Sequence, residues 1–286
     1  MSTRIRIIDA FSDTPFAGNP AAVCVLDGEA WPDEGWMARV AGEMRMPMTA
    51  FALRLRDGAR ADWGLRWFNA TMAEDDFCGH ATLGTAHLLF GDGLAQNAVR
   101  FDTRAGILVA RPQEDGAITL DFPAAQVTAR DVPGGLDAAL GGVHVESAHA
   151  TGTLRDLLAV VADEAAVRSV VPDWAALEAV AEREDLRGII VTGPGGGRDG
   201  HDFVSRFFSP TGGIYEDAVT GSAHTALAPY WSGRLGRERL VGLQASARTG
   251  MVRTELAGDR VLLTGRAVVV VDGSLLAAEV APPAAV

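Results

Sequence analysis

Short apolar or alternating runs bounded by turn residues recur along the chain and predict β-strands. They are IRIIDAF, AAVCVLD, FALRLR, LRWFN, GILVARP, AITLDF and GIIVTGPG. Apolar residues at helical spacing predict helices over residues 31–44, 81–90, 154–162, 174–183 and 220–235. The segment VRTELAGDRVLLTGRAVVVVDG predicts a hairpin. Many strands with a helix inside each half of the chain indicate an α+β protein.

Two stretches of the sequence repeat one another. EDDFCGHATLGTAH begins at residue 74 and EDAVTGSAH begins at residue 216, an offset of 142 (216 minus 74). Without a gap, this offset matches four pairs of identical residues: Glu74 with Glu216, Asp75 with Asp217, Gly79 with Gly221, and Ala81 with Ala223. Each stretch follows an aromatic strand and leads into an alanine-rich helix. The repeat predicts a structural duplication.

The duplication divides the chain into two similar halves. A looser region from 123 to about 142 separates them, and we place the domains at residues 1–125 and 126–286. This division leaves open that the final strand packs back on the first domain. Each half is expected to be a sheet curled around one central helix.

Composition and charge remove several classes of function. The net charge of −12 argues against a nucleic-acid partner, because phosphate contacts need clustered basic groups. No apolar run approaches the roughly 20 residues of a membrane helix. The start MSTRIRIIDAF lacks the pattern of a signal peptide, so we expect a cytoplasmic protein with no membrane partner.

The basic residues are all arginine, because the sequence contains no lysine. A pyridoxal-phosphate enzyme and a Schiff-base aldolase need a lysine, as does a Walker-A phosphate loop. These three classes are excluded. The two cysteines, Cys24 and Cys78, make no disulfide framework, and Cys24 reads as a buried strand residue. The six histidines show no zinc-ligand spacing, so no metal site is expected.

The acidic stretches permit two interpretations. Their carboxylates, among them Glu74, Asp76 and Glu216, are simple solvated groups at helix N-termini in one interpretation, with His80 and His224 as capping or surface residues. In the other, two helix N-termini face each other across an interdomain cleft and bind a small anionic substrate.

Three segments together, FAGNPAAV, EDDFCGHATLGTAH and EDAVTGSAH, resemble the PhzF family of phenazine-biosynthesis-like isomerases. The resemblance spans nearly the whole chain. It implies the diaminopimelate epimerase-like fold, with two pseudo-symmetric domains, each a curled sheet around a central helix, and the active site in the interdomain cleft. It also implies proton transfer between carbons of a small carboxylated substrate without a cofactor, and a homodimer.

The same resemblance carries functional residues onto this chain. It implies that Asp217 and His80 are proton carriers on opposite walls of the cleft. The substrate contacts that it implies are Gly79, Gly221, Ser222, Thr82 and Asn19. The arginine-, alanine- and glycine-rich composition is typical of a GC-rich bacterial genome, where such proteins often serve specialised metabolism.

One position departs from the family pattern. Family members carry a glutamate general acid/base in a stretch like NLSETAF, and the corresponding stretch here is RMPMTAF, with Met48 at the glutamate position. A thioether cannot accept and return a proton at neutral pH. Epimerase relatives use two opposed cysteines; Cys78 occupies the first position, whereas Thr220 occupies the second and is not a usable base.

Three functions remain open at this point. The first is an isomerase acting on a small cyclic or unsaturated carboxylate or amino acid, with Asp217, His80 and Cys78 as candidate proton carriers. For Cys78 a packing role is an equal alternative, because many family members have a cysteine here beside their glutamate. The second is a non-catalytic relative that binds a metabolite. The third is an amino-acid epimerase, which Thr220 disfavours.

Overall fold

The chain forms two compact units in the computed structural model, which describes residues 3–196, 200–211 and 215–276. Unit 1 comprises Met1–Leu120 and Gly265–Val286, and unit 2 comprises Asp121–Thr264. The sequence-based division puts the boundary after residue 125 and runs the second domain to residue 286, of which 277–286 lie outside the described residues. The last described strand, β18, pairs with the first, β1.

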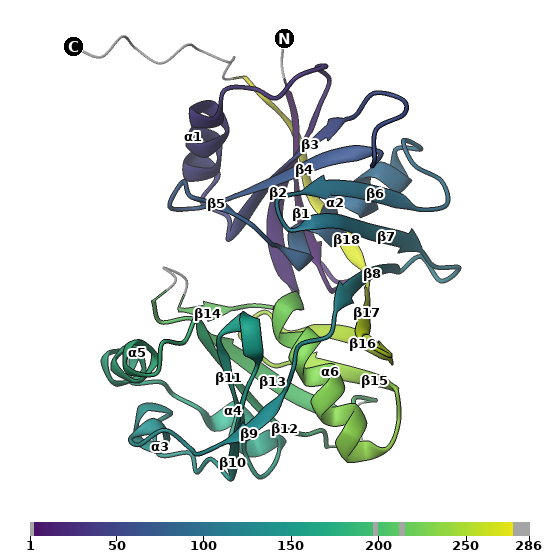
Figure 1. The fold of residues 1–286 in the computed structure, drawn as a ribbon. Coiled ribbons are helices and arrows are strands. Elements are labelled where there is room, and N and C mark those ends of the chain that lie inside the picture. The colour runs from purple at the N-terminus through teal and green to yellow at the C-terminus, as the bar shows by residue number, and fades with distance from the viewer. Residues whose placement is uncertain (1–2, 197–199, 212–214, 277–286) are drawn as a thin grey trace, which may run out of the picture. The chain divides into compact units, whose positions relative to one another are not determined.

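Unit 1 is a mixed sheet with a helix on each face (Figure 1). Its strands, in the order β18–β1–β2–β3–β4–β6–β7, are Ala267–Leu275, Thr3–Ala10, Asn19–Leu26, Met48–Arg54, Trp63–Asn69, Val99–Thr103 and Gly106–Pro112. The two-residue strand β5 (Glu74–Asp75) pairs with β4, and β8 (Ile118–Pro123) leads into unit 2.

The two helices of unit 1 differ in how completely they are buried. Helix α1 (Glu34–Met44) begins three residues later than predicted, because Pro32 precedes the N-cap Asp33, whose carboxylate accepts a 2.9 Å hydrogen bond from the Trp36 N–H. Helix α2 (Gly79–Gly91) is buried on almost every side. Gly84 of α2 lies so close to Ile8 of β1 that an added Cβ would touch it at 3.5 Å.

Unit 2 repeats this arrangement. Its strands, in the order β9–β10–β11–β12–β13–β15–β16–β17, are Thr128–Arg130, Ser147–Ala150, Asp156–Val160, Gly188–Pro194, Phe203–Phe208, Arg239–Gln244, Gly250–Ala257 and Arg260–Gly265. The short strand β14 (Glu216–Asp217) pairs with β13. The helices are α3 (Leu136–Ala139), α4 (Glu164–Ser169), α5 (Trp174–Arg183) and α6 (Gly221–Leu235), with a 3₁₀ turn at Gly152–Leu154.

The helix predicted over residues 154–162 is wrong, since residues Asp156–Val160 form strand β11. Both faces of this strand are buried. Leu158 packs in the cluster with α6, and Leu157 packs in the cluster with α3, α4 and α5. A strand covered on both sides is apolar at every position and loses the two-residue alternation that distinguishes it from a helix. The predicted C-terminal hairpin is confirmed for β16 and β17, but β18 leaves it to pair with β1.

The predicted duplication is confirmed by the strand pairing. In unit 1, β1–β2 is antiparallel, β2–β3 parallel, β3–β4 antiparallel and β4–β6 parallel. The corresponding pairs of unit 2, β10–β11, β11–β12, β12–β13 and β13–β15, have the same directions in the same order. Glu74 pairs with Phe68, and Glu216 pairs with Phe208, so that even the short acidic strands share one register.

Candidate active site

The start of α2 marks one end of the unit 1 sheet, because β1 runs along this helix in the opposite direction. Arg6 in β1 donates a 3.0 Å hydrogen bond to Asp92, the C-cap of α2. Further along β1, Ile8 lies against Gly84. The end of β1 and the loop to β2 therefore lie toward the start of α2.

Five residues singled out by the sequence or its repeat share this end of unit 1. Asn19 begins β2, and Met48 begins β3, whose register pairs Met48 with Ala21 and with Asn69. Asp75 lies in β5 beside the end of β4. We call Asn19, Met48, Asp75, Cys78 and His80 the unit 1 cluster. Met48 and Asn19 are buried, and the position at which the family resemblance implies a glutamate is thus filled by an apolar strand residue.

A thiol and an imidazole lie side by side where α2 begins. Cys78 is the N-cap of α2, Gly79 is its first residue, and His80 follows. The Cys78 Sγ lies 3.5 Å from Nδ1 and 3.9 Å from Nε2 of His80, within hydrogen-bond range for sulfur. Both side chains are buried. Thr82 is also buried, and its hydroxyl donates a 2.5 Å hydrogen bond to the Cys78 carbonyl, which ties it to the helix start.

The glutamates of the repeated stretches make ion pairs and lie in strands before the helices. Glu74 accepts hydrogen bonds of 2.7 and 2.5 Å from Arg66, and Arg104 approaches it to 2.6 Å. In unit 2, Arg206 donates bonds of 2.7 and 2.8 Å to Glu216. Neither helix has an acidic residue in its first turn, so the interpretation of these carboxylates as helix-terminal groups is wrong for Glu74 and Glu216.

Unit 2 gathers hydrogen-bonding groups at the start of α6. Asp217 Oδ2 accepts a 2.7 Å bond from the hydroxyl of Thr220, the N-cap of α6. Gln244, at the end of β15, donates to the Asp217 carbonyl at 2.8 Å and accepts from the Thr220 N–H at 2.8 Å. Gly221 is the first residue of the helix and Ser222 the second.

An arginine and a buried aspartate, neither of which the sequence motifs indicate, complete this group. Arg187 donates bonds of 2.9 and 2.5 Å to Asp156 and a bond of 3.0 Å to Ser222 Oγ. Burial raises the pKa of Asp156, and the bonds from Arg187 counteract this. We call Asp156, Arg187, Asp217, Thr220 and Ser222 the unit 2 cluster. No motif marks Arg187, because its partners lie 31 and 35 residues away in sequence.

His224 occupies in α6 the position that Thr82 occupies in α2. Its Nδ1 donates a 2.8 Å bond to the Thr220 carbonyl, as the Thr82 hydroxyl does to Cys78. The ring is fully buried, and burial lowers its pKa to about 4. His224 is therefore a neutral residue that supports the start of α6.

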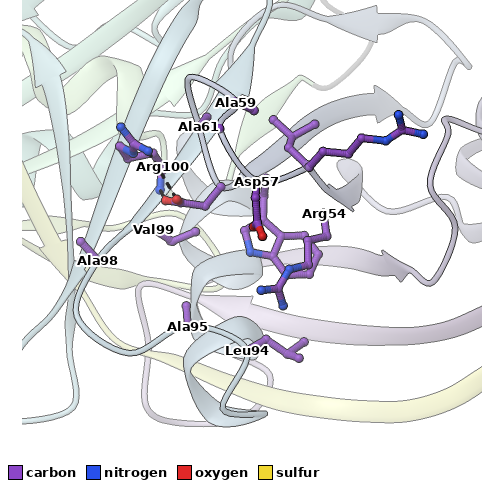
Figure 2. Close-up of a pocket in the computed structure, with 14 residues that line it drawn as sticks. Arg54, Asp57, Ala59, Ala61, Leu94, Ala95, Ala98, Val99 and Arg100 are labelled. Carbon is purple, nitrogen blue, oxygen red and sulfur yellow. Dashed lines mark hydrogen bonds and ion pairs between the residues drawn. The ribbon is translucent and has the colours of Figure 1, made fainter.

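The pocket drawn in Figure 2 is separate from both clusters. Its volume is about 250 Å³, and it lies in unit 1 between the loop after β3 and the segment after α2, with Arg54, Asp57, Leu94 and Arg100 in its wall. This is the opposite end of α2 from Cys78. A more open hollow of about 520 Å³ lies beside Arg45, Ala70 and Met72, close in sequence to the unit 1 cluster.

Membrane-spanning helices and metal-binding clusters are both absent from residues 3–196, 200–211 and 215–276. Within these ranges no helix is long and apolar enough to cross a membrane. The same ranges contain no group of three or more His, Cys, Asp or Glu side chains arranged to hold a metal ion.

The duplicated sheet-and-helix architecture defines the fold class of the protein as diaminopimelate epimerase-like. The crystal structure of a hydroxyproline epimerase from Agrobacterium vitis with bound trans-4-hydroxy-L-proline shares this fold at a TM-score of 0.55 and 14% identity, covering 96% of this chain and 91% of that chain. A crystal structure of a PhzF-family phenazine biosynthesis protein from Enterococcus faecalis is much closer, with a TM-score of 0.87 and 38% identity over 97% of this chain and 100% of that one.

The family is shown by the sequence as well. The model of the PhzC-PhzF family, described as phenazine biosynthesis-like protein, matches residues 8–273. A protein of Pseudomonas aeruginosa named as an uncharacterized isomerase is 42% identical over 276 residues, which cover 96% of this chain and 99% of that protein. The chain belongs to the PhzC-PhzF family, and the resemblance inferred from the three motifs is confirmed.

Proposed function

We propose that this chain is an isomerase that moves a proton between carbons of a small cyclic or unsaturated carboxylate. The observation that carries the proposal is the contact of Cys78 with His80 at the start of α2, at the end of the sheet where Met48 replaces the expected glutamate. Histidine side chains take up and release protons near neutral pH, and an adjacent thiol offers a second exchangeable proton.

The proposed reaction breaks one C–H bond and forms another. A base of the unit 1 cluster takes the proton from one carbon of the substrate, and the proton returns at a second carbon, so that a double bond moves without net oxidation or added cofactor. His80 with Cys78 carries the proton in unit 1. Asp217, held by the Thr220 hydroxyl, is the proposed carrier in unit 2.

The remaining site residues have binding and supporting roles in the proposal. Asn19, Gly79, Gly221 and Ser222 contact the substrate, and the backbone N–H groups in the first turn of each helix, which have no carbonyl acceptor within the helix, are donors to its carboxylate. Thr82 supports the start of α2 through its bond to Cys78.

The test is incubation with dihydro-hydroxyanthranilate and with a panel of cyclic amino acids in D2O. Incorporation of deuterium into carbon, detected by NMR and mass spectrometry, is expected for at least one substrate. His80→Gln and Asp217→Asn are each expected to lower the exchange rate by at least about 100-fold. Near-normal exchange in either variant would remove that residue from its role.

A second function, metabolite binding without turnover, is favoured by Met48 alone. It predicts tight binding of a carboxylate ligand and no exchange with any substrate. In that case Met48→Glu, which restores the acid at the start of β3, is the informative variant. Exchange on the family substrate that appears only in Met48→Glu would show that the natural chain does something other than this isomerisation. Symmetric two-base epimerisation is less consistent with unit 2, where the Thr220 hydroxyl is a donor to Asp217.

A further inference from the structure

Arg187 lies at the corner of unit 2 that corresponds to the Met48 corner of unit 1. Gly188 begins β12 and pairs in parallel with Asp156, just as Met48 begins β3 and pairs in parallel with Ala21. The two positions match because their next residues pair with Phe208 and Phe68 in the equivalent neighbouring strands. Arg187 comes directly before Gly188, and its counterpart in unit 1 is therefore Pro47, directly before Met48. The fold brings a cation to the start of α6 where unit 1 has an apolar residue.

The guanidinium of Arg187 is fixed from two sides. The Asp156 side chain is fully buried and accepts two parallel hydrogen bonds from it, at 2.9 and 2.5 Å. The centroid of the Phe207 ring lies 5.4 Å from Arg187 Cζ, so the ring packs against the face of the guanidinium. A fork-shaped cation held by a buried carboxylate and an aromatic face has lost much of its rotamer freedom before any ligand arrives. Yet 43% of the Arg187 side chain stays exposed.

Arg187 also determines whether the Ser222 hydroxyl donates or accepts a hydrogen bond toward a ligand. Ser222 Oγ accepts a hydrogen bond from Arg187 at 3.0 Å. A hydroxyl has one proton to donate, and because a lone pair is occupied by the cation, that proton is directed toward another acceptor. A bond from a charged donor also makes the hydroxyl a stronger donor itself. The acceptor it would meet lies at the start of α6, where the N–H groups and the helix dipole favour negative charge.

We propose that Arg187 is a positioning residue for a carboxylate ligand: held by Asp156, it presents the Ser222 O–H as a donor and supplies positive charge beside it. The ligand group is a planar carboxylate, which accepts a bond from Ser222 Oγ and bonds from the first N–H groups of α6. This inference rests on the proposed function only in taking the carboxylate as part of the substrate.

The experiment measures binding of benzoate and its neutral analogue benzamide by calorimetry to the full chain. The variants are Arg187→Gln, Arg187→Lys, Ser222→Ala and the double variant Arg187→Gln/Ser222→Ala. Arg155→Gln is the matched control, because Arg155 lies in the same unit and pairs with the exposed Asp185 at the surface. Thermal melting of each variant checks that it is folded.

The wild type is expected to prefer benzoate to benzamide. Arg187→Gln is expected to weaken benzoate at least about tenfold and to leave benzamide unchanged. Arg187→Lys keeps the charge but not the fork that reaches both Asp156 and Ser222, so it should not restore wild-type affinity. The double variant should lose less than the product of the two single losses, because both act through one hydroxyl.

Equal affinity in Arg187→Gln and Arg155→Gln would overturn the inference, as would a wild type that does not prefer benzoate. The deuterium-exchange assay separates this failure from failure of the proposed function. If benzoate binding depends on Arg187 but no deuterium exchange is detected, the isomerase is refuted and the positioning role stands. If deuterium exchange occurs and Arg187→Gln has the KM of the wild type, the positioning role is refuted and the isomerase stands. If both hold, Arg187→Gln raises KM more than it lowers kcat.

Discussion

Replacing Glu74 by glutamine tests whether the glutamate of each repeated stretch is structural. The Glu74 side chain is 5% exposed and faces two arginines, Arg66 and Arg104. Glutamine keeps the shape but removes the charge, and its amide has one acceptor oxygen where the carboxylate has two. Because breaking a buried pair leaves a poorly compensated cation, we expect a loss of about 2–4 kcal/mol in the unfolding free energy, the lower end reflecting water access to the arginines. The deuterium-exchange rate per folded molecule should not change.

The matched control is Glu34→Gln, which removes the other carboxylate of the same arginine. Glu34 approaches Arg66 to 2.7 Å but is 64% exposed. Solvent screens this pair, so Glu34→Gln should be indistinguishable from wild type. The assay is urea unfolding followed by tryptophan fluorescence, since four of the six tryptophans, Trp31, Trp36, Trp63 and Trp67, lie in unit 1. Equal midpoints for the two variants would refute the structural assignment of Glu74, and a loss of exchange without a loss of stability would make Glu74 part of the chemistry.

Three further predictions concern titratable groups. Burial lowers the pKa of His224 to about 4, so its contribution to stability is complete above about pH 6.5 and is lost as pH falls toward 4, by about 3 kcal/mol in all. His224→Thr, which copies the residue at the equivalent position Thr82, should flatten that part of the pH profile of urea unfolding; an unchanged slope would contradict the assignment. For Glu164, burial raises the pKa, but hydrogen bonds led by that from His201 outweigh it and lower the pKa to about 2. Its contribution is therefore present above about pH 4.5 and lost as pH falls toward 2, and His201→Gln should make acid unfolding begin at higher pH. Burial raises the pKa of Cys24 to about 12, so iodoacetamide should modify it only after unfolding, and mass spectrometry showing modification of the folded chain would contradict this.

The duplication could be predicted from sequence because its signals are local. A Glu-Asp strand, a glycine at the first helical position and an alanine-rich helix all lie within one short stretch, and they repeat without a gap. Strand β11 could not be predicted, because its identity depends on helices that cover both of its faces. Helix α4 has six residues and too few apolar positions to show a period.

The residues of the candidate site also fall into two groups, those that local sequence signals indicate and those that they do not. Cys78, His80, Asp217 and Ser222 can be proposed from the sequence because they adjoin the repeated helix starts and match the family motifs. Arg187 cannot, because its contacts with Asp156 and Ser222 join β11, the start of β12 and α6. Such contacts arise only when the sheet forms, and no spacing in the sequence encodes them.

The two helix starts show which features the duplication retained and which it changed. The fourth residue after each N-cap bonds to the N-cap carbonyl in both units, through threonine at Thr82 and histidine at His224. The N-cap and the second helical residue have instead diverged, from Cys78 and His80 in unit 1 to Thr220 and Ser222 in unit 2. The contact with the N-cap carbonyl is retained although its residue differs, and it stabilises the helix start in both units. A thiol and an imidazole therefore occupy the two divergent positions in unit 1, and two hydroxyl groups occupy them in unit 2. This asymmetry supports the proposed isomerase over racemisation by two equivalent bases, because the two helix starts do not carry the same side chains.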